Sequence, residues 1–157
     1  MAGNIKPAKS SGKWSQAYFT PKNPEKYIGT YPIKARSSWE LVFMNKCDTH
    51  PNIKQWASES IKIPYRNPVT GKNTVYIPDF LIHYVDKYGK THVELIEIKP
   101  IKQTMMEKAR GTRAKMVVAI NMAKWKAAQI WCKKHNMTFR VMTEEKMFAQ
   151  TMGHPKS

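Results

Sequence analysis

Apolar and polar residues alternate through the middle of the chain, and this alternation predicts three successive strands. The first covers residues 56–65, the second 73–85 and the third 92–99. Residues 67–71 and 86–89 separate them and contain the Gly, Asn, Pro and Asp residues that favour turns. Because short turns join antiparallel neighbours, we expect an antiparallel meander of three strands.

Helical spacing of apolar residues predicts one helix on each side of this meander. The first opens at Ser37 or Ser38, since either hydroxyl can cap it, and ends near residues 48–50, before Pro51. Its apolar stripe comprises Trp39, Val42, Phe43 and Cys47. The second helix covers residues 116–135 and is rich in lysine.

A fourth strand over residues 137–142 follows this second helix, and a short last helix begins at residues 143–145. A strand that follows a long helix usually returns beside an earlier strand through a right-handed crossover. The predicted fold class is therefore α/β, with an αβββαβ core in which helices flank a mixed four-stranded sheet.

The domain boundary is predicted from a change of composition near residue 34. Residues 1–34 are rich in Lys, Pro, Ser and Gly, and we expect a basic N-terminal arm that is docked or partly disordered. Residues 35–157 are expected to form a single domain. Aromatic side chains in the arm can dock on the domain or stack on bases, and docking is favoured. They are Trp14, Tyr18, Phe19 and Tyr27.

Two acids and a lysine interrupt the apolar strands. Strand parity puts Asp79 on one face of the second strand, and Glu97 and Lys99 on one face of the third. If these strands pair around Gly89, Asp79 and Glu97 become cross-strand neighbours with Cβ atoms roughly 5 Å apart. Ionised groups are costly to bury unless they are paired or bind a metal. The pattern predicts a Mg²⁺ site, with Mn²⁺ as an alternative, although a salt bridge on paired strands would also produce it.

Lys99 stands two residues beyond Glu97 on the same face, roughly 7 Å along the strand. Its ammonium could orient an attacking water or stabilise charge that develops on a phosphate. A metal, a water and a cation around one phosphodiester are the parts that metal-assisted hydrolysis needs.

The balance of charge favours a nucleic-acid partner. The chain carries 27 Lys and Arg against 11 Asp and Glu, a formal net charge of +16. An anionic membrane is the alternative, but no run approaches the length of a membrane span, so we expect no membrane partner. No small-molecule substrate is expected either. The candidate DNA contacts are Arg36, Lys102, Arg110, Arg113 and Lys124.

Several longer motifs in the sequence resemble those of a known protein family. They are Ser11-Gly12-Lys13-Trp14, residues 31–40 with Arg36-Ser37-Ser38-Trp39-Glu40, Ser58-Glu59 with Ile63-Pro64-Tyr65, Pro78-Asp79-Phe80, Glu97-Ile98-Lys99-Pro100, Lys124-Trp125-Lys126-Ala127-Ala128-Gln129, and Phe139-Arg140 with Thr143-Glu144. The chain resembles the PD-(D/E)xK, or restriction-endonuclease-like, nuclease superfamily, and within it the head completion nucleases of T-even-type tailed phages. The resemblance implies that Glu40, Asp79 and Glu97 are metal-site carboxylates and that Lys99 is the catalytic lysine.

The same resemblance implies a biological setting. It implies a metal-dependent DNA endonuclease that processes packaged DNA ends during phage head completion, in the host cytoplasm and then the virion. Capsid or portal and neck proteins would be its partners. Two alternatives stay open: a non-catalytic virion protein that binds DNA ends or the portal region, and a DNA junction-resolving endonuclease.

Overall fold

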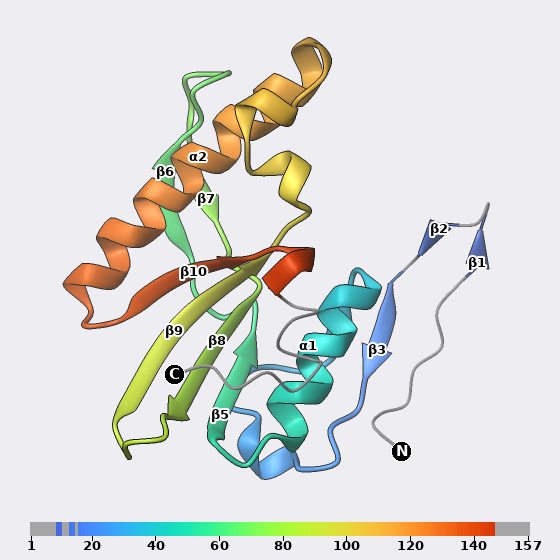
Figure 1. The fold of residues 1–157 in the computed structure, drawn as a ribbon, viewed down its shortest axis with the longest axis vertical. Helices are drawn as coiled ribbons and strands as arrows, with labels where there is room; N and C mark the ends of the chain where they lie inside the picture. Colours follow the sequence, from blue (N-terminus) through green and yellow to red (C-terminus); the bar gives the residue numbers. More distant parts are fainter. Residues whose placement is uncertain (1–8, 11–12, 15, 147–157) are drawn as a thin grey trace.

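The computed structural model describes residues 9–10, 13–14 and 16–146, and within them helices cover both faces of a mixed sheet (Figure 1). The main sheet has four strands in the order β10-β9-β8-β5. Strand β10 runs parallel to β9, whereas β9 with β8 and β8 with β5 are antiparallel. This arrangement confirms the predicted α/β core with a mixed four-stranded sheet.

The helices and strands have the following bounds. The strands are β1 Lys9–Ser10, β2 Lys13–Trp14, β3 Ala17–Phe19, β4 Ile33–Ala35, β5 Ile53–Ser58, β6 Ile63–Arg66, β7 Asn73–Tyr76, β8 Phe80–Val85, β9 Thr91–Ile98 and β10 Thr138–Met142. The helices are α1 Ser38–Thr49 and α2 Gly111–Lys134, with short 3₁₀ turns η1 Pro24–Lys26, η2 Ile101–Gln103 and η3 Met106–Lys108.

The first two predicted strands are each broken in two, and this corrects the sequence prediction. Strand β5 ends at Ser58 because Glu59 adopts φ of 50°, in the left-handed region where a strand cannot continue. The second break lies between Tyr76 and Phe80, around Pro78, which has no N–H to give to a ladder. The outer halves, β6 and β7, pair with each other as a separate two-stranded sheet.

Helix α1 begins where the serines predicted it. Ser37 is the N-cap, and its hydroxyl accepts a hydrogen bond from the Glu40 N–H over 3.1 Å. Phe43, Met44 and Cys47 on its inner side are buried against one face of the main sheet. Val42, which we expected in the apolar stripe, is exposed instead.

Helix α2 covers the opposite face of the sheet and packs on the β6–β7 hairpin. It begins at Gly111, earlier than the predicted residue 116, and Gly111 itself has φ of 83°. Ala128 and Cys132 of α2 are buried against Leu95 of β9. A glycine and two positive side chains at 110–113 disguised this first turn, because glycine is a poor helix former.

Residues 16–35, most of which fall within the predicted arm, pack on the rest of the fold. Strand β3 pairs with β4, and the buried Phe19 ring meets the Trp56 ring edge-on at 5.9 Å between centroids. The buried carboxylate of Asp48 accepts hydrogen bonds from the N–H groups of Lys22 at 2.8 Å and Asn23 at 2.9 Å. This part of the chain is therefore tied to the C-terminal end of α1 by hydrogen bonds from its backbone N–H groups to one buried side chain.

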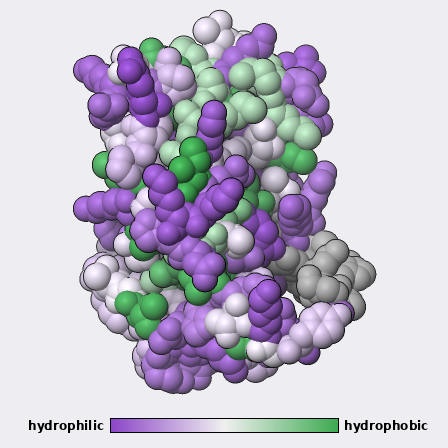
Figure 2. All heavy atoms as spheres, turned by 90° about the vertical axis from the view of Figure 1, so that its left-hand side faces the viewer, coloured by the Kyte–Doolittle hydropathy of each residue, from purple (hydrophilic) through white to green (hydrophobic). Residues whose placement is uncertain are grey.

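Hydrophilic side chains cover most of the face shown in Figure 2, with apolar ones gathered in small areas between them. In the part of the chain that the structure describes, no helix has the length and hydropathy needed to cross a membrane. The last predicted helix begins at Glu144, and its continuation lies outside the described residues.

Candidate active site

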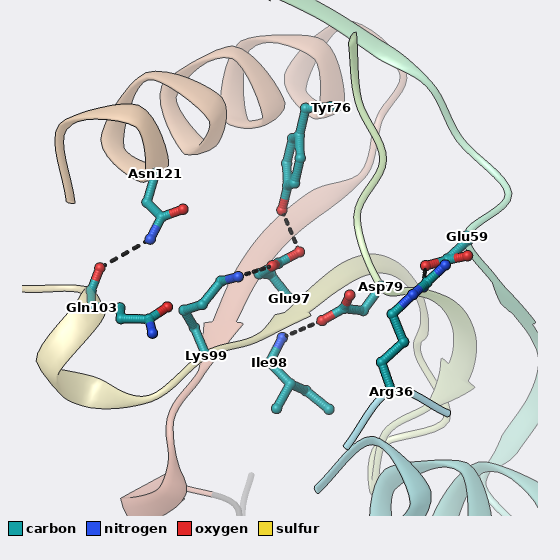
Figure 3. A network of polar contacts seen from close by, with 9 residues as sticks. All are labelled: Arg36, Glu59, Tyr76, Asp79, Glu97, Ile98, Lys99, Gln103 and Asn121. Atoms are coloured by element: carbon teal, nitrogen blue, oxygen red, sulfur yellow. Dashed lines mark hydrogen bonds and ion pairs between the residues drawn. The ribbon is translucent and has the colours of Figure 1, made fainter. Parts of the chain in front are cut away.

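Asp79 and Glu97 meet at the end of the β8–β9 hairpin, beside α2. The hairpin register pairs Phe80 with Ile96, so its next step places Asp79 opposite Glu97. Both side chains project to the side of the sheet that α2 covers, as strand parity predicts, and they lie next to each other in Figure 3. The strands therefore bring together the two carboxylates that the sequence singled out.

Glu97 is buried, with 5% of its surface exposed, and both of its oxygens have partners. The phenol of Tyr76 donates a hydrogen bond to Oε1 over 2.6 Å. The ammonium of Lys99 lies 3.2 Å from Oε2. A buried carboxylate between a phenol and a cation stays satisfied without water.

Asp79 is partly buried, and its Oδ2 accepts a hydrogen bond from the Ile98 N–H over 2.8 Å. Burial raises its pKa well above the usual range, and the negative charges of Glu97 and Glu40 add to this rise. The Ile98 N–H and the Lys99 ammonium lower the pKa by less. Burial and two neighbouring acids therefore favour the protonated form of Asp79.

Glu40 reaches the same region from the first turn of α1. Its Oε1 accepts a hydrogen bond from the Arg36 N–H over 3.0 Å. Burial raises the pKa of this carboxyl, Arg36 lowers it, and the charges of Glu97 and Lys99 act on it in opposite directions. Glu40 is therefore close enough to the strand carboxylates to share their electrostatic field.

The predicted DNA contacts divide into residues at the site and residues farther along the chain. Lys124 is at the site: burial and then Lys99 lower its pKa, while Glu97 and Asp79 raise it. The Arg36 guanidinium forms an ion pair with Glu59. The remaining three have exposed side chains: Lys102 in η2, Arg110 at the N-cap of α2 and Arg113 in its first turn.

Comparison with known proteins shows the family of this chain. Residues 50–144 match the model of the TnsA-like endonuclease N-terminal domain. The chain belongs to that family. It is also 36% identical over 146 residues to the head completion nuclease of Enterobacteria phage T4, in an alignment that covers 86% of this chain and 91% of the T4 protein. No solved structure matches the chain with statistical significance.

The matched range of the TnsA-like family contains much of the candidate site. Asp79, Glu97, Lys99 and Lys124 lie inside it, whereas Glu40 lies before it. The family belongs to the restriction-endonuclease-like superfamily, which agrees with the observed sheet. Glu40 therefore reaches the site from helix α1, which precedes the residues that match the family.

Two buried polar residues of this TnsA-like domain escaped the sequence prediction. Parity along an unbroken strand would put Tyr76 on the face opposite Asp79, but the break before Phe80 turns it toward Glu97. Asn121 of α2 is 4% exposed and donates a hydrogen bond to the Gln103 carbonyl over 3.1 Å, which ties η2 to the helix (Figure 3). The proline before Asp79 was the available signal for the strand break, and no comparable signal marked Asn121.

Proposed function

We propose that this chain is a Mg²⁺-dependent DNA endonuclease that acts in phage head completion, where it hydrolyses phosphodiester bonds to process packaged DNA ends. The observation that carries the proposal is the placement of two carboxylates, Asp79 and Glu97, next to each other at the end of the β8–β9 hairpin, with the Lys99 ammonium 3.2 Å from Glu97. Its setting is a TnsA-like endonuclease domain in a relative of the T4 head completion nuclease.

The donor chemistry of the site fits a hard divalent cation. Mg²⁺ is commonly held by one or two carboxylates, with water and substrate phosphate in its other positions. Among the residues described, no group of three or more His, Cys, Asp and Glu side chains is arranged to hold a metal. We therefore assign Asp79 and Glu97 as the direct ligands and place Glu40 where it can bind through water. The raised pKa of Asp79, which comes from burial and then from the charges of Glu97 and Glu40, supports a cation here, because a positive charge would stabilise the ionised carboxylate.

The residues of the chain have separate tasks in the proposed reaction. When bound, Mg²⁺ would supply a Lewis acid for the phosphate and lower the pKa of a water. The Lys99 ammonium orients that water or stabilises the charge that develops on the phosphate oxygens. Lys124 adds a second cation near the carboxylates. The attacking water releases one proton to solvent as its oxygen bonds to phosphorus, the bond to the leaving oxygen breaks, and that oxygen takes up a proton from solvent.

The phage setting comes from the relative and is part of the proposal. A head completion nuclease would meet DNA at the capsid or at the portal and neck proteins. It would work in the host cytoplasm during assembly and could remain in the virion. The net charge of +16 supports DNA as the partner, because Lys and Arg contacts to phosphate release counterions.

Purified protein incubated with linear duplex DNA tests the proposal. We expect cleavage with Mg²⁺ or Mn²⁺ and none with EDTA. Asp79→Asn and Glu97→Gln keep the shape of each side chain and should reduce the rate by at least about a hundredfold. Glu107→Gln, an exposed acid of η3, is the matched control and should cleave like the wild type.

The same assay separates the alternatives. A protein that binds DNA with Mg²⁺ present but gives only background product, equal in wild type and variants, would be a non-catalytic DNA-binding component of the head. Strong preference for a four-way junction over linear DNA, together with a dimeric solution mass, would identify a junction-resolving enzyme instead.

A further inference from the structure

Tyr76 is a buried polar residue at the end of β7, in a different sheet from the carboxylate that it contacts. Its side chain is 4% exposed, and its hydroxyl donates to Oε1 of Glu97 over 2.6 Å. The proposed chemistry uses Glu97 as a metal ligand but gives Tyr76 no part. Figure 3 shows the phenol pointing down onto Glu97 from the side where α2 lies.

The two polar partners of Glu97, a hydrogen-bonding phenol and an ion-paired ammonium, fix the plane of its carboxylate. The Tyr76 hydroxyl holds Oε1, and the Lys99 ammonium holds Oε2 at 3.2 Å. A ligand carboxylate that is held in this way presents its remaining lone pairs in one direction, and such partners tune metal affinity. With Lys99 alone, the carboxylate could rotate about its last bond.

The ring of Tyr76 is itself fixed by two neighbours. The Phe139 ring of β10 meets it edge-on, with 6.3 Å between centroids and 79° between planes. The Lys124 ammonium of α2 lies 5.6 Å from its centroid, within the range of a cation–π contact. One side chain therefore links the β6–β7 hairpin, the main sheet and α2 beside Glu97, near the end of β9.

We propose that Tyr76 is a positioning residue, which sets the orientation of the Glu97 carboxylate for the metal and holds Lys124 beside it. This inference rests on the proposed metal-dependent nuclease function. The phenol touches neither the metal nor the phosphate in this role. Its contribution is the direction in which Glu97 offers its oxygens.

The chain offers a matched control on the β8–β9 hairpin, which also carries Glu97. Tyr84 of β8 donates to Oε2 of Glu94 over 3.1 Å, which is also a tyrosine–glutamate hydrogen bond on β9. Glu94 lies on the opposite face from Glu97, because the two positions differ by three along the strand. Tyr76→Phe and Tyr84→Phe each remove one hydroxyl from such a pair, and only the first should alter the metal site.

The first measurement is Mn²⁺ binding to the protein without DNA, monitored through the loss of the electron paramagnetic resonance signal of free Mn²⁺. We expect Tyr76→Phe to weaken Mn²⁺ binding about tenfold or more. Tyr84→Phe should bind Mn²⁺ like the wild type. Thermal melting in EDTA checks that both variants are folded at the assay temperature.

The second measurement is DNA cleavage as a function of Mg²⁺ concentration. Tyr76→Phe should need more Mg²⁺ for half-maximal rate and lose kcat at low Mg²⁺, with the KM for DNA unchanged. Unaltered Mn²⁺ binding in Tyr76→Phe, or equal losses in the two phenylalanine variants, overturns the inference while leaving the nuclease proposal intact. A wild type that binds no Mn²⁺ and cleaves nothing overturns the proposed function itself, and this inference with it.

Discussion

Asp79 lies opposite Glu97, one step beyond the last residue pair of the β8–β9 register. The ladder does not continue to this step, since the Asp79 side chain itself accepts the Ile98 N–H over 2.8 Å. A carboxylate thus takes the place of a backbone acceptor at the end of the hairpin. The arrangement brings two acids together, so the ionised form of Asp79 lowers the stability of the folded protein.

Without a divalent cation, Asp79→Asn should stabilise the protein, and increasingly so as the pH rises. Burial and two neighbouring acids raise the folded-state pKa of Asp79, so the folded protein holds its proton to a higher pH than the unfolded chain does. Wild-type stability therefore falls as pH rises from the unfolded value of about 3.9 to the folded pKa. The asparagine carbonyl still accepts the Ile98 N–H and carries no charge. In melting experiments in EDTA between pH 4 and pH 8, the Tm of Asp79→Asn should exceed that of the wild type by a margin that grows with pH. A margin that stays constant with pH contradicts the prediction.

Mg²⁺ should stabilise the wild type against heat, and Glu97→Gln should abolish most of that effect. A ligand at a hundred times its dissociation constant adds about 2.7 kcal/mol to the free energy of unfolding. For a chain of this size that corresponds to roughly 5–10 °C in Tm. Calorimetry with Mg²⁺ and then excess EDTA measures it, with NaCl at equal ionic strength as the control for screening. Equal shifts in wild type and Glu97→Gln would remove Glu97 from the metal site.

Arg36→Gln should weaken DNA binding more than Glu59→Gln does. The Arg36 side chain is 47% exposed at the edge of the site, and its ion pair with Glu59 is near the surface. Such a pair contributes at most about 1 kcal/mol to stability, so both variants should remain folded. Loss of one phosphate contact lowers the salt dependence of binding by about one unit of slope. Fluorescence anisotropy over a range of salt gives that slope, and an unchanged slope in Arg36→Gln excludes the contact.

Asp48→Ala should destabilise the fold by about 2–4 kcal/mol, because the N–H groups of Lys22 and Asn23 lose their buried acceptor. Urea unfolding measures the loss. Limited proteolysis should then cut first within residues 16–30. Thr49→Ala, at an exposed neighbour on the same helix, is the control and should change stability by less than about 1 kcal/mol. Cleavage elsewhere before residues 16–30 would argue against this attachment.

The sequence predicted the order of helices and strands and the face shared by Asp79 and Glu97, because both follow from local periodicity. It failed where periodicity runs across a break. Val75 and Ile77 continue the alternation toward Asp79, yet they are 50% and 40% exposed, because Val75 belongs to a hairpin outside the main sheet and Ile77 to the break that follows it. Alternation predicts which side chains share a face of a strand, but it does not predict whether another part of the protein buries that face.

The role of Tyr76 could not be predicted for the same reason. Parity within an unbroken strand puts it on the opposite side from Asp79. The irregular backbone around Pro78 reorients the chain, so the phenol and the carboxylate both reach Glu97. Asp48 escaped prediction because its partners are backbone N–H groups far away in the sequence, which no side-chain pattern reveals.

The parallel pairing of β10 with β9 has a consequence for the order in which the protein is made. The Lys99 N–H donates to the Met142 carbonyl over 3.0 Å, and the Ile101 N–H donates to Glu144 over 2.8 Å. The ribosome adds Met142 and Glu144 only after the whole of α2. A nascent chain that stops before Thr138 leaves β9 as an open edge strand, with the backbone around Lys99 unsecured. Glu97 and Lys99 are therefore synthesised early, but the backbone that carries them is fixed only when β10 has been synthesised.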